Sequence, residues 1–231
     1  MEMALIADIH GNRPALEAVA ADIGRRGIEQ ICCLGDVVGK GPSTKWALNW
    51  ARQNCALVLA GNWDLFIAEN PEGKCQFHVD QLDAADLDWL RALPLEHRCL
   101  FSGRRVRLVH GRPSFELIGV SAQAERFDEV FGQGEPYDVL GYADIHQPGM
   151  RILPGDRYVF TTGSVGNALN DTRAHYVILS GEPGKASADF CINMVSVEYD
   201  REQAIRDARD AVGLVRADAF IREIETGVYS R

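Results

Sequence analysis

Side chains that can bind divalent cations recur through the first two thirds of this 231-residue chain. Asp8 and His10 are separated by one residue, so in an extended segment both can point to the same side. Asp36 and Asn62 follow the next two apolar runs and add a second carboxylate and a neutral amide oxygen. Three further candidate ligands lie beyond them: His110, Asp144 and His146.

These seven positions would be enough for two cations, with Asp36 as the residue that bridges them. Two divalent cations roughly 3.5 to 4 Å apart supply a nucleophile at neutral pH and neutralise the charge that develops when a phosphoester is hydrolysed. Taken singly, the residues have simpler explanations, since Asp8 could cap a helix, Asn62 could form a turn and His110 could be a hydrogen-bonded core histidine. Their occurrence at five separate strand ends favours a dinuclear metal centre and predicts a phosphoester hydrolase.

The apolar runs that precede these residues alternate with helical patterns. Pro14 near a helix start, Leu16, Val19 and Ile23 on one apolar face, and Gly27 at the end predict the first helix. Strands that alternate with helices are typical of a parallel α/β sheet. In the rest of this part we expect strands over 3–7, 30–34 and 56–60 and helices over 43–53 and 81–93.

The later part of the chain contains more strand patterns and fewer helical ones. We expect strands over 106–109, 137–142, 158–161, 175–179 and 190–197, a helix over 121–131, and two helices near the C-terminal end. Strands with few helices between them predict a more antiparallel sheet in this half. The fold class expected is therefore α/β (α+β), with two packed sheets and helices outside them. The chain shows no internal repeat or linker, so one domain over 1–231 is expected.

The composition limits the possible partners. A formal net charge of −9 argues against an extended nucleic-acid surface, which would need a broad basic face to displace counterions. A small anionic substrate stays possible if cations occupy the site. The longest apolar runs are far shorter than the ~20 residues that a membrane helix requires. The N-terminal residues show no leader pattern, so we expect a cytoplasmic protein without a membrane partner.

The cysteines show no metal-binding or redox spacing. None forms a C-x-x-C pair, and we expect reduced, buried thiols that act as small apolar side chains. Three histidines have no ligand partner nearby in the sequence and are expected to be structural or surface residues: His78, His97 and His175.

Six short segments resemble those of the calcineurin-like metallophosphoesterases, most closely the small single-domain bacterial and archaeal phosphodiesterase-type members. The likeness extends over about residues 1 to 180 in both order and spacing. The segments are 8–12 (Asp-Ile-His-Gly-Asn), 35–42 (Gly-Asp-Val-Val-Gly-Lys-Gly-Pro), 61–64 (Gly-Asn-Trp-Asp), 110–111 (His-Gly), 144–148 (Asp-Ile-His-Gln-Pro) and 163–166 (Gly-Ser-Val-Gly).

The resemblance implies a four-layer α-β-β-α sandwich of two mixed sheets flanked by helices. It also implies two divalent cations, with manganese expected and iron, magnesium or zinc as alternatives, and a shared hydroxide that attacks phosphorus in line. By position, the first cation would be held by Asp8, His10, Asp36 and His146, and the second by Asp36, Asn62, His110 and Asp144. The residues assigned to catalysis by the same resemblance are Asp36, Asn62 and Asp64.

Three residues are expected to contact the substrate. Asn12 lies beside the first motif, and Lys40 falls where some branches of the family carry an arginine that holds phosphate, although Lys40 could equally be an ordinary loop lysine. Trp63 replaces a histidine that donates a proton to the leaving group, and indole cannot do so near pH 7. Its ring could stack on a base or aryl group, or only pack at the pocket edge. Ser164 and Arg112 are weaker candidates.

The last ligand motif also departs from the family pattern, Gly-His-x-His. Asp144 stands in place of the first histidine, and a shifted alignment would make Tyr142 and Asp144 the ligands and leave His146 outside. We prefer the alignment that uses His146, because His-Gln-Pro matches the usual continuation. A third aspartate leaves less excess positive charge for phosphate, and an oxygen-richer second site should favour manganese or magnesium over zinc.

The expected function is a metal-dependent phosphodiesterase that acts on a small phosphoester or nucleotide. The alternatives are a dinucleoside polyphosphatase or protein phosphatase of the same family, which Lys40 favours, and a non-catalytic metal-binding relative, which Trp63 and Asp144 favour. The sequence makes no prediction about the oligomeric state.

Overall fold

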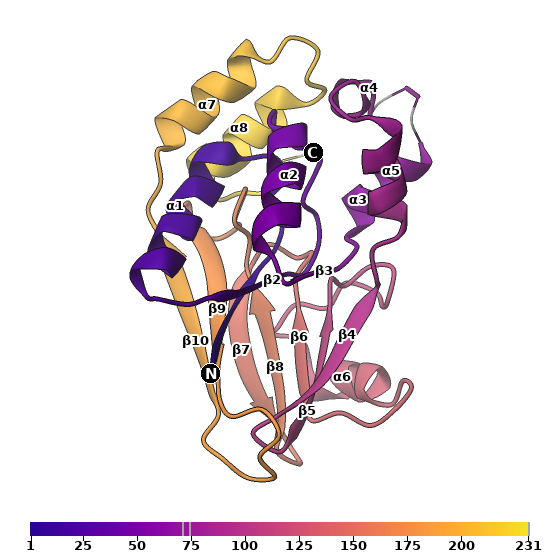
Figure 1. The fold of residues 1–231 in the computed structure, drawn as a ribbon, viewed down its shortest axis with the longest axis vertical. Coiled ribbons are helices and arrows are strands. Elements are labelled where there is room, and N and C mark those ends of the chain that lie inside the picture. The colour runs from indigo at the N-terminus through magenta and orange to yellow at the C-terminus, as the bar shows by residue number, and fades with distance from the viewer. Residues whose placement is uncertain (71, 74, 231) are drawn as a thin grey trace.

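The computed structural model describes residues 1–70, 72–73 and 75–230. Two five-stranded sheets lie face to face, with helices on their outer sides (Figure 1). The first sheet has the order β10-β9-β1-β2-β3, in which β1–β2 and β2–β3 are parallel and the other two pairs are antiparallel. Its strands are β1 (Glu2–Ile6), β2 (Gln30–Cys33), β3 (Leu57–Val58), β9 (Ala174–Ser180) and β10 (Cys191–Val197).

The second sheet has the order β4-β5-β6-β8-β7. The pairs β5–β6 and β6–β8 are parallel, and the two outer pairs are antiparallel. The expectation of a more antiparallel second half is confirmed, because the pairs β4–β5, β7–β8, β1–β9 and β9–β10 are antiparallel, although the centre of this sheet is parallel. Its strands are β4 (Glu96–Phe101), β5 (Arg104–Val109), β6 (Val139–Tyr142), β7 (Pro148–Leu153) and β8 (Arg157–Thr162).

Strand β1 is buried on both faces, because it lies at the centre of the sandwich. Ala4 and Ile6 face the helices that cover the first sheet, whereas Met3 and Leu5 face the second sheet. Side chains alternate between the two faces of a strand, so both faces must be apolar when both are covered. This explains why the run reads as continuously apolar rather than alternating.

Helices form the two outer layers. Leu16, Val19 and Ile23 of the first helix pack on the first sheet, and Phe127 and Val130 pack on the outer face of the second sheet. The four-layer sandwich expected from the sequence is thus confirmed. The helices are α1 (Arg13–Arg25), α2 (Thr44–Asn54), α3 (Asn62–Glu69), α4 (Gln76–Val79), α5 (Ala84–Arg91), α6 (Ala124–Phe131), α7 (Arg201–Asp210) and α8 (Ala217–Thr226).

Several elements had no clear signal in the sequence. The edge strands β4 and β7 carry polar residues such as Glu96 and Arg98, and β7 begins at Pro148, because an edge strand needs less apolar surface and tolerates a missing amide donor. The helix expected over 81–93 is shorter, since Asp83 caps it and forms a capping box with Asp86.

Two other expectations concern cysteines and membranes. All the cysteines are free, but Cys191 is exposed at the start of edge strand β10, so the expectation of buried thiols was wrong at this position. Among the helices of the described residues, none combines the length and the apolar character needed to cross a bilayer.

Candidate metal centre

The predicted ligands converge at one end of the sandwich. Asp8 follows β1, and Asp36 follows β2, while His110 follows β5 and Asp144 lies just beyond β6. The strands β1 and β2 are parallel to each other, as are β5 and β6, so each sheet presents its carboxyl ends together. A hydrogen bond of 3.3 Å from the Asp144 amide to Asp8 Oδ2 joins the two sheets at this point.

The backbone is unusual where these side chains leave it. Ten non-glycine residues of the described chain have a positive φ, and six of them are residues that the sequence singled out. A positive φ costs a residue with a Cβ roughly 1–2 kcal/mol, and such strain gathers at functional sites. The six residues, with φ between 48° and 68°, are Asp8, His10, Asp36, Lys40, Asp144 and His146.

Four of the predicted ligands form one compact buried group. Asp8, His10, Asp36 and His146 each offer a ligand atom, and these atoms lie within 4.8 Å of one another. His10 Nε2 is 3.4 Å from Asp36 Oδ2 and 3.3 Å from His146 Nε2. His146 Nε2 is in turn 3.4 Å from Asp8 Oδ1. The group is the set that the resemblance implies for the first cation.

Backbone carbonyls orient the histidine rings. Val38 O lies 3.2 Å from His10 Nδ1, Asn167 O lies 2.9 Å from His146 Nδ1, and Leu34 O lies 2.8 Å from His110 Nδ1. Because a carbonyl only accepts, we assign the proton to Nδ1 in each ring. In His10 and His146 the Nε2 lone pair then faces the cluster, which is the arrangement of metal-binding histidines.

An unpartnered buried oxygen tests whether a cation fits here. Asp8 Oδ1 is buried and has no hydrogen-bond partner, and a buried acceptor without a donor is costly. Burial raises the pKa of Asp8 well above its usual value, and it lowers the pKa of His10 and His146, which therefore stay neutral. Two carboxylates and two neutral imidazoles are a fitting donor set for a divalent cation.

Asp36 lies between the first group and a second group formed by His110 and Asn62. Its Oδ2 is 3.4 Å from His10 Nε2 and also 3.4 Å from His110 Nε2, which is where a bridging carboxylate would be. Asn62 Oδ1 is 3.2 Å from His110 Nε2. Burial opposes protonation of His110, but the charge of Asp36, with smaller effects of Asp8 and Asp144, raises its pKa to about 10. Three of the four residues expected at a second cation thus come together.

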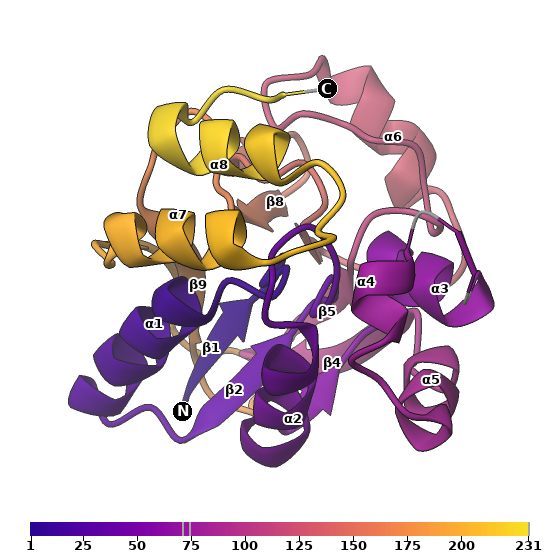
Figure 2. The same ribbon diagram turned by 90° about the horizontal axis from the view of Figure 1, so that it is seen from above.

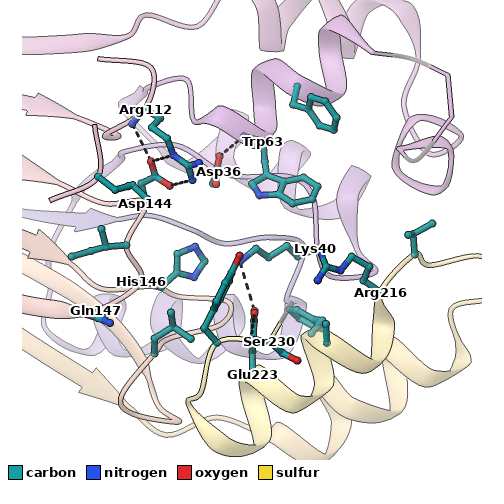
Figure 3. Close-up of a pocket in the computed structure, with 18 of the residues that line it drawn as sticks. Asp36, Lys40, Trp63, Arg112, Asp144, His146, Gln147, Arg216, Glu223 and Ser230 are labelled. Carbon is teal, nitrogen blue, oxygen red and sulfur yellow. Dashed lines mark hydrogen bonds and ion pairs between the residues drawn. The ribbon is translucent and has the colours of Figure 1, made fainter. Parts of the chain in front are cut away.

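The fourth residue, Asp144, is bound by an arginine instead. Its Oδ2 accepts hydrogen bonds from the Arg112 amide at 3.0 Å and from Nε at 2.8 Å, and its Oδ1 accepts one from Nη2 at 2.7 Å (Figure 3). Burial acts to raise the pKa of Asp144, but the hydrogen bonds from Arg112 outweigh it and lower the pKa. The arrangement differs from the expected one, because both carboxylate oxygens are committed to Arg112.

The Tyr142 hydroxyl lies away from the cluster. It donates to the carbonyl of Ile118 at 2.5 Å, and its ring packs among the apolar side chains on the outer face of the second sheet. The alignment that uses His146 therefore matches the placement of these side chains.

Asp64 binds the backbone of the segments that carry Asp36 and Asn62. It is buried, and its carboxylate accepts hydrogen bonds from the amides of Asp36 at 2.8 Å, Val38 at 3.1 Å and Gly61 at 3.0 Å. Burial and the nearby charge of Asp36 raise the pKa of Asp64 to about 7. Its oxygens face backbone amides rather than the ligand cluster, so the structure places Asp64 as a positioning residue.

The segment after β3 is fitted closely to Asp36. The Trp63 amide donates to Asp36 Oδ1 at 2.8 Å, at the start of α3. A Cβ at position 61 would lie 2.1 Å from Asp36 Oδ1, so only glycine allows this approach. The Trp63 ring meets the His10 ring edge-on, with 6.1 Å between centroids. The Gly-Asn-Trp-Asp segment therefore holds Asp36 and places an aromatic ring beside the ligands.

Asn12 does not reach the pocket. Its Oδ1 accepts from the Ala15 amide at 3.2 Å and caps α1, and its Nδ2 donates to Gly166 O at 2.6 Å. Its amide is therefore committed to the fold, and the expectation of a phosphate contact is not supported by its position. Ser164 has a related role, since its hydroxyl donates to the carbonyl of Asp8 at 2.9 Å.

A pocket of about 780 Å³ opens over the cluster (Figure 3). Residues of α3, α4 and α8 line this pocket. In Figure 2 the ribbon of α8 lies apart from those of α3 and α4. The residues of α8 carry no motif, so its place beside the pocket was not predicted. Charged side chains on the pocket wall are Asp36, Lys40, Arg112, Asp144, Arg216 and Glu223, and apolar ones include Trp63, Phe66, Leu117, Val215 and Phe220.

Comparison with known proteins identifies the class. A family model described as the calcineurin-like phosphoesterase superfamily domain matches residues 1–183. The chain belongs to this family, whose members are metal-dependent phosphoric ester hydrolases.

Individual proteins with which this chain shares sequence or fold include two relatives and a solved structure. The chain is 29% identical over 224 residues to the uncharacterized protein MJ0912 of Methanocaldococcus jannaschii, covering 87% of this chain and 89% of the relative. It is 27% identical over 185 residues to the phosphodiesterase YfcE of Escherichia coli strain K12, covering 79% and 89%. A metallophosphoesterase structure from Sphaerobacter thermophilus shares the fold, with a TM-score of 0.77, 24% identity and 99% of each chain covered.

Proposed function

We propose that this protein is a phosphodiesterase that hydrolyses small organic phosphodiesters, including those of nucleotides. The observation that carries the proposal is the unpartnered Asp8 Oδ1 within a four-ligand group, at a pocket with charged and apolar walls. The relative named as a phosphodiesterase supports the preference for diesters.

Two sets of residues would hold the cations. The first cation would be bound by Asp8, His10, Asp36 and His146, and we propose manganese because carboxylate and imidazole donors suit it. A second cation would share Asp36 with the first and would also be bound by Asn62 and His110. Asp144 would join these ligands once it is released from Arg112. Such cations supply positive charge for the phosphate and lower the pKa of water to near neutral.

The walls of the pocket would orient the substrate. Lys40 and Arg112 offer positive charge for the non-bridging phosphate oxygens. Trp63 and Phe66, whose rings meet edge-on with centroids 6.2 Å apart, offer an apolar wall for the organic group. Trp63 has no proton to give to a leaving group near pH 7, so diesters with weakly basic leaving groups should react best.

The remaining expectations from the sequence belong to the same proposal. We propose one domain over 1–231, a small-molecule partner rather than a nucleic acid or a membrane, and a cytoplasmic location. Free thiols such as Cys32 and Cys33 are typical of a reducing compartment.

Hydrolysis of bis-p-nitrophenyl phosphate tests the proposal. Metal-stripped protein reloaded with Mn²⁺ should release nitrophenolate, and Asp36→Asn should lose at least about a hundredfold of that rate because the shared ligand is weakened. Asp88→Asn, at an exposed ion pair on α5, is the matched control and should keep full activity. The proposal fails if the parent turns over diadenosine polyphosphates or phosphopeptides far faster than diesters, or if it hydrolyses no phosphoester.

A further inference from the structure

Asp144, one of the four residues expected to hold a second cation, is paired with Arg112. Arg112 makes three hydrogen bonds to the two carboxylate oxygens, at 2.7, 2.8 and 3.0 Å. The Asp144 side chain is 2% exposed, whereas that of Arg112 is 49% exposed. The carboxylate is therefore a fixed, buried group, and the guanidinium is the partner that can move.

Gly111 makes room for this pair. Its φ is +142°, and a Cβ there would lie 2.9 Å from Asp144 Cβ. Asp144 can consequently lie directly against the backbone between His110 and Arg112, with the Arg112 amide and side chain both within reach. The pairing is built into the loop that carries His110, a predicted ligand of the same cation.

The two candidate cation sites are thus prepared to different degrees. At the first, Asp8 Oδ1 has no partner and the four ligand atoms already lie together. At the second, Asp144 Oδ2 already accepts two hydrogen bonds and Oδ1 accepts one. A cation on Asp144 would lie at the same carboxylate as the permanently charged guanidinium of Arg112. Two positive charges that share one carboxylate repel strongly in a low-dielectric site.

We infer that Arg112 competes with the second cation for Asp144, so that the protein binds one divalent ion tightly and a second one more weakly. This inference rests on the proposed function only in assuming that a second cation can bind. When Asp144 does bind it, Arg112 is released at the pocket wall, where its planar donors can engage a phosphate in two hydrogen bonds. Occupation of the second site and capture of substrate phosphate then become coupled.

Calorimetric titration of the metal-stripped protein with Mn²⁺ alone tests the inference. We expect two binding events, the first at least about tenfold tighter than the second. Arg112→Gln should tighten the second event by roughly ten- to a hundredfold and leave the first unchanged, because Asp144 loses its charged competitor.

The chain contains a matched control pair. Arg105 binds Asp138 through the same three atoms, its amide at 2.8 Å, Nε at 3.0 Å and Nη2 at 2.5 Å, but Asp138 is not among the pocket residues. Arg105→Gln removes an arginine of the same geometry and should leave both Mn²⁺ affinities unchanged. A tightened second event in this control as well would overturn the inference, since the effect would then be one of net charge.

A second variant covers the case in which Arg112→Gln fails to fold. Asp144→His removes the carboxylate that Arg112 holds and supplies a neutral nitrogen ligand, so it should also bind two Mn²⁺ ions tightly. Electron paramagnetic resonance should show a magnetically coupled pair in this variant at two equivalents, and mainly isolated Mn²⁺ in the parent at one equivalent.

Two equally tight ions in the parent would contradict the inference. So would a second event that neither Arg112→Gln nor Asp144→His improves, with folding verified by thermal unfolding. These titrations contain no substrate, so failure of the proposed function appears separately. A protein with this binding pattern that hydrolyses no diester would refute the proposed function alone.

Discussion

Lys40 Nζ lies 3.7 Å from Glu223 Oε2, so helix α8 provides the carboxylate that holds the pocket lysine. Glu223, labelled beside the pocket with Lys40 in Figure 3, is buried. It accepts hydrogen bonds from Asn167 Nδ2 at 2.6 Å and from the Ser230 amide at 3.0 Å. Helix α8 lies beyond residues 1–183, which the family model matches. The position of Lys40 thus depends on a part of the chain outside the shared domain.

This contact predicts energetic coupling between Lys40 and Glu223. Lys40→Gln and Glu223→Gln should each raise the KM for a phosphodiester roughly three- to tenfold, and the double variant should do little more than either alone, because both disrupt one contact. A double-mutant cycle of KM values measures this. Lys185→Gln, which breaks an exposed pair with Glu182, is the control. Additive effects of the two substitutions would show that Lys40 works independently of α8.

Asp64 should matter for stability as well as for activity. Asp64→Asn keeps the size of the side chain but turns an amide group toward the backbone donors of Asp36, Val38 and Gly61, leaving at least one unsatisfied. The free energy of unfolding should fall by about 2 to 4 kcal/mol. Urea unfolding of the metal-stripped protein measures the change, with Asp88→Asn as the exposed control. Unchanged stability would show that Asp64 does not hold these backbone amides in place.

His78 should make the protein less stable in acid. Burial lowers the pKa of His78 from an ordinary value near 6.5 to about 4, so the unfolded chain binds a proton that the folded protein does not. Its contribution to stability is complete above pH 6.5 and is lost as the pH falls toward 4, by up to about 3 kcal/mol.

The pH effect is isolated by comparing urea midpoints of the parent and His78→Gln at pH 7, 6 and 5. His78 Nδ1 lies 2.8 Å from the Thr44 hydroxyl, so the substitution costs some stability at every pH. The variant should lose less stability than the parent between pH 7 and pH 5. Parallel curves would show that other groups carry the acid sensitivity.

Trp63→His should widen the range of leaving groups. A histidine beside the ligands could protonate a departing alkoxide, which typically contributes a factor of roughly 10² to 10⁴. We expect turnover of an alkyl diester to rise at least about tenfold relative to that of bis-p-nitrophenyl phosphate, whose leaving group needs no proton. Trp63→Phe, which removes the indole without adding an acid, controls for lost packing. An equal change with both substrates would count against the missing-acid explanation.

The sequence predicted the parts of this structure that depend on local pattern. The first strands and helices were found because β1 and β2 are buried by the helices of the first layer, which requires apolar runs of defined period. Asp8 and Asp36 were recognised because they end such runs. Asn12 was assigned to substrate although it precedes Pro14, a capping signal that the structure shows to be dominant.

The remainder depends on contacts between distant residues. Arg112 and Asp144 are 32 positions apart, and no local sequence pattern predicts that one binds the other. Glu223 reaches the pocket only because α8 packs back across the end of the sandwich. Sequence reasoning thus located the ligands of the first group and named Lys40 and Arg112, but it missed Arg216, Glu223 and the contact between Arg112 and Asp144.

Anomalous diffraction from crystals grown with Mn²⁺ is the most direct test of the central claim. The account predicts a strong manganese peak among Asp8 Oδ1, His10 Nε2, Asp36 Oδ2 and His146 Nε2, with metal–ligand distances near 2.0 to 2.3 Å. It also predicts a weaker peak beside His110 and Asn62. Crystals of protein that hydrolyses diesters in Mn²⁺ but show no manganese at the first group would contradict the account.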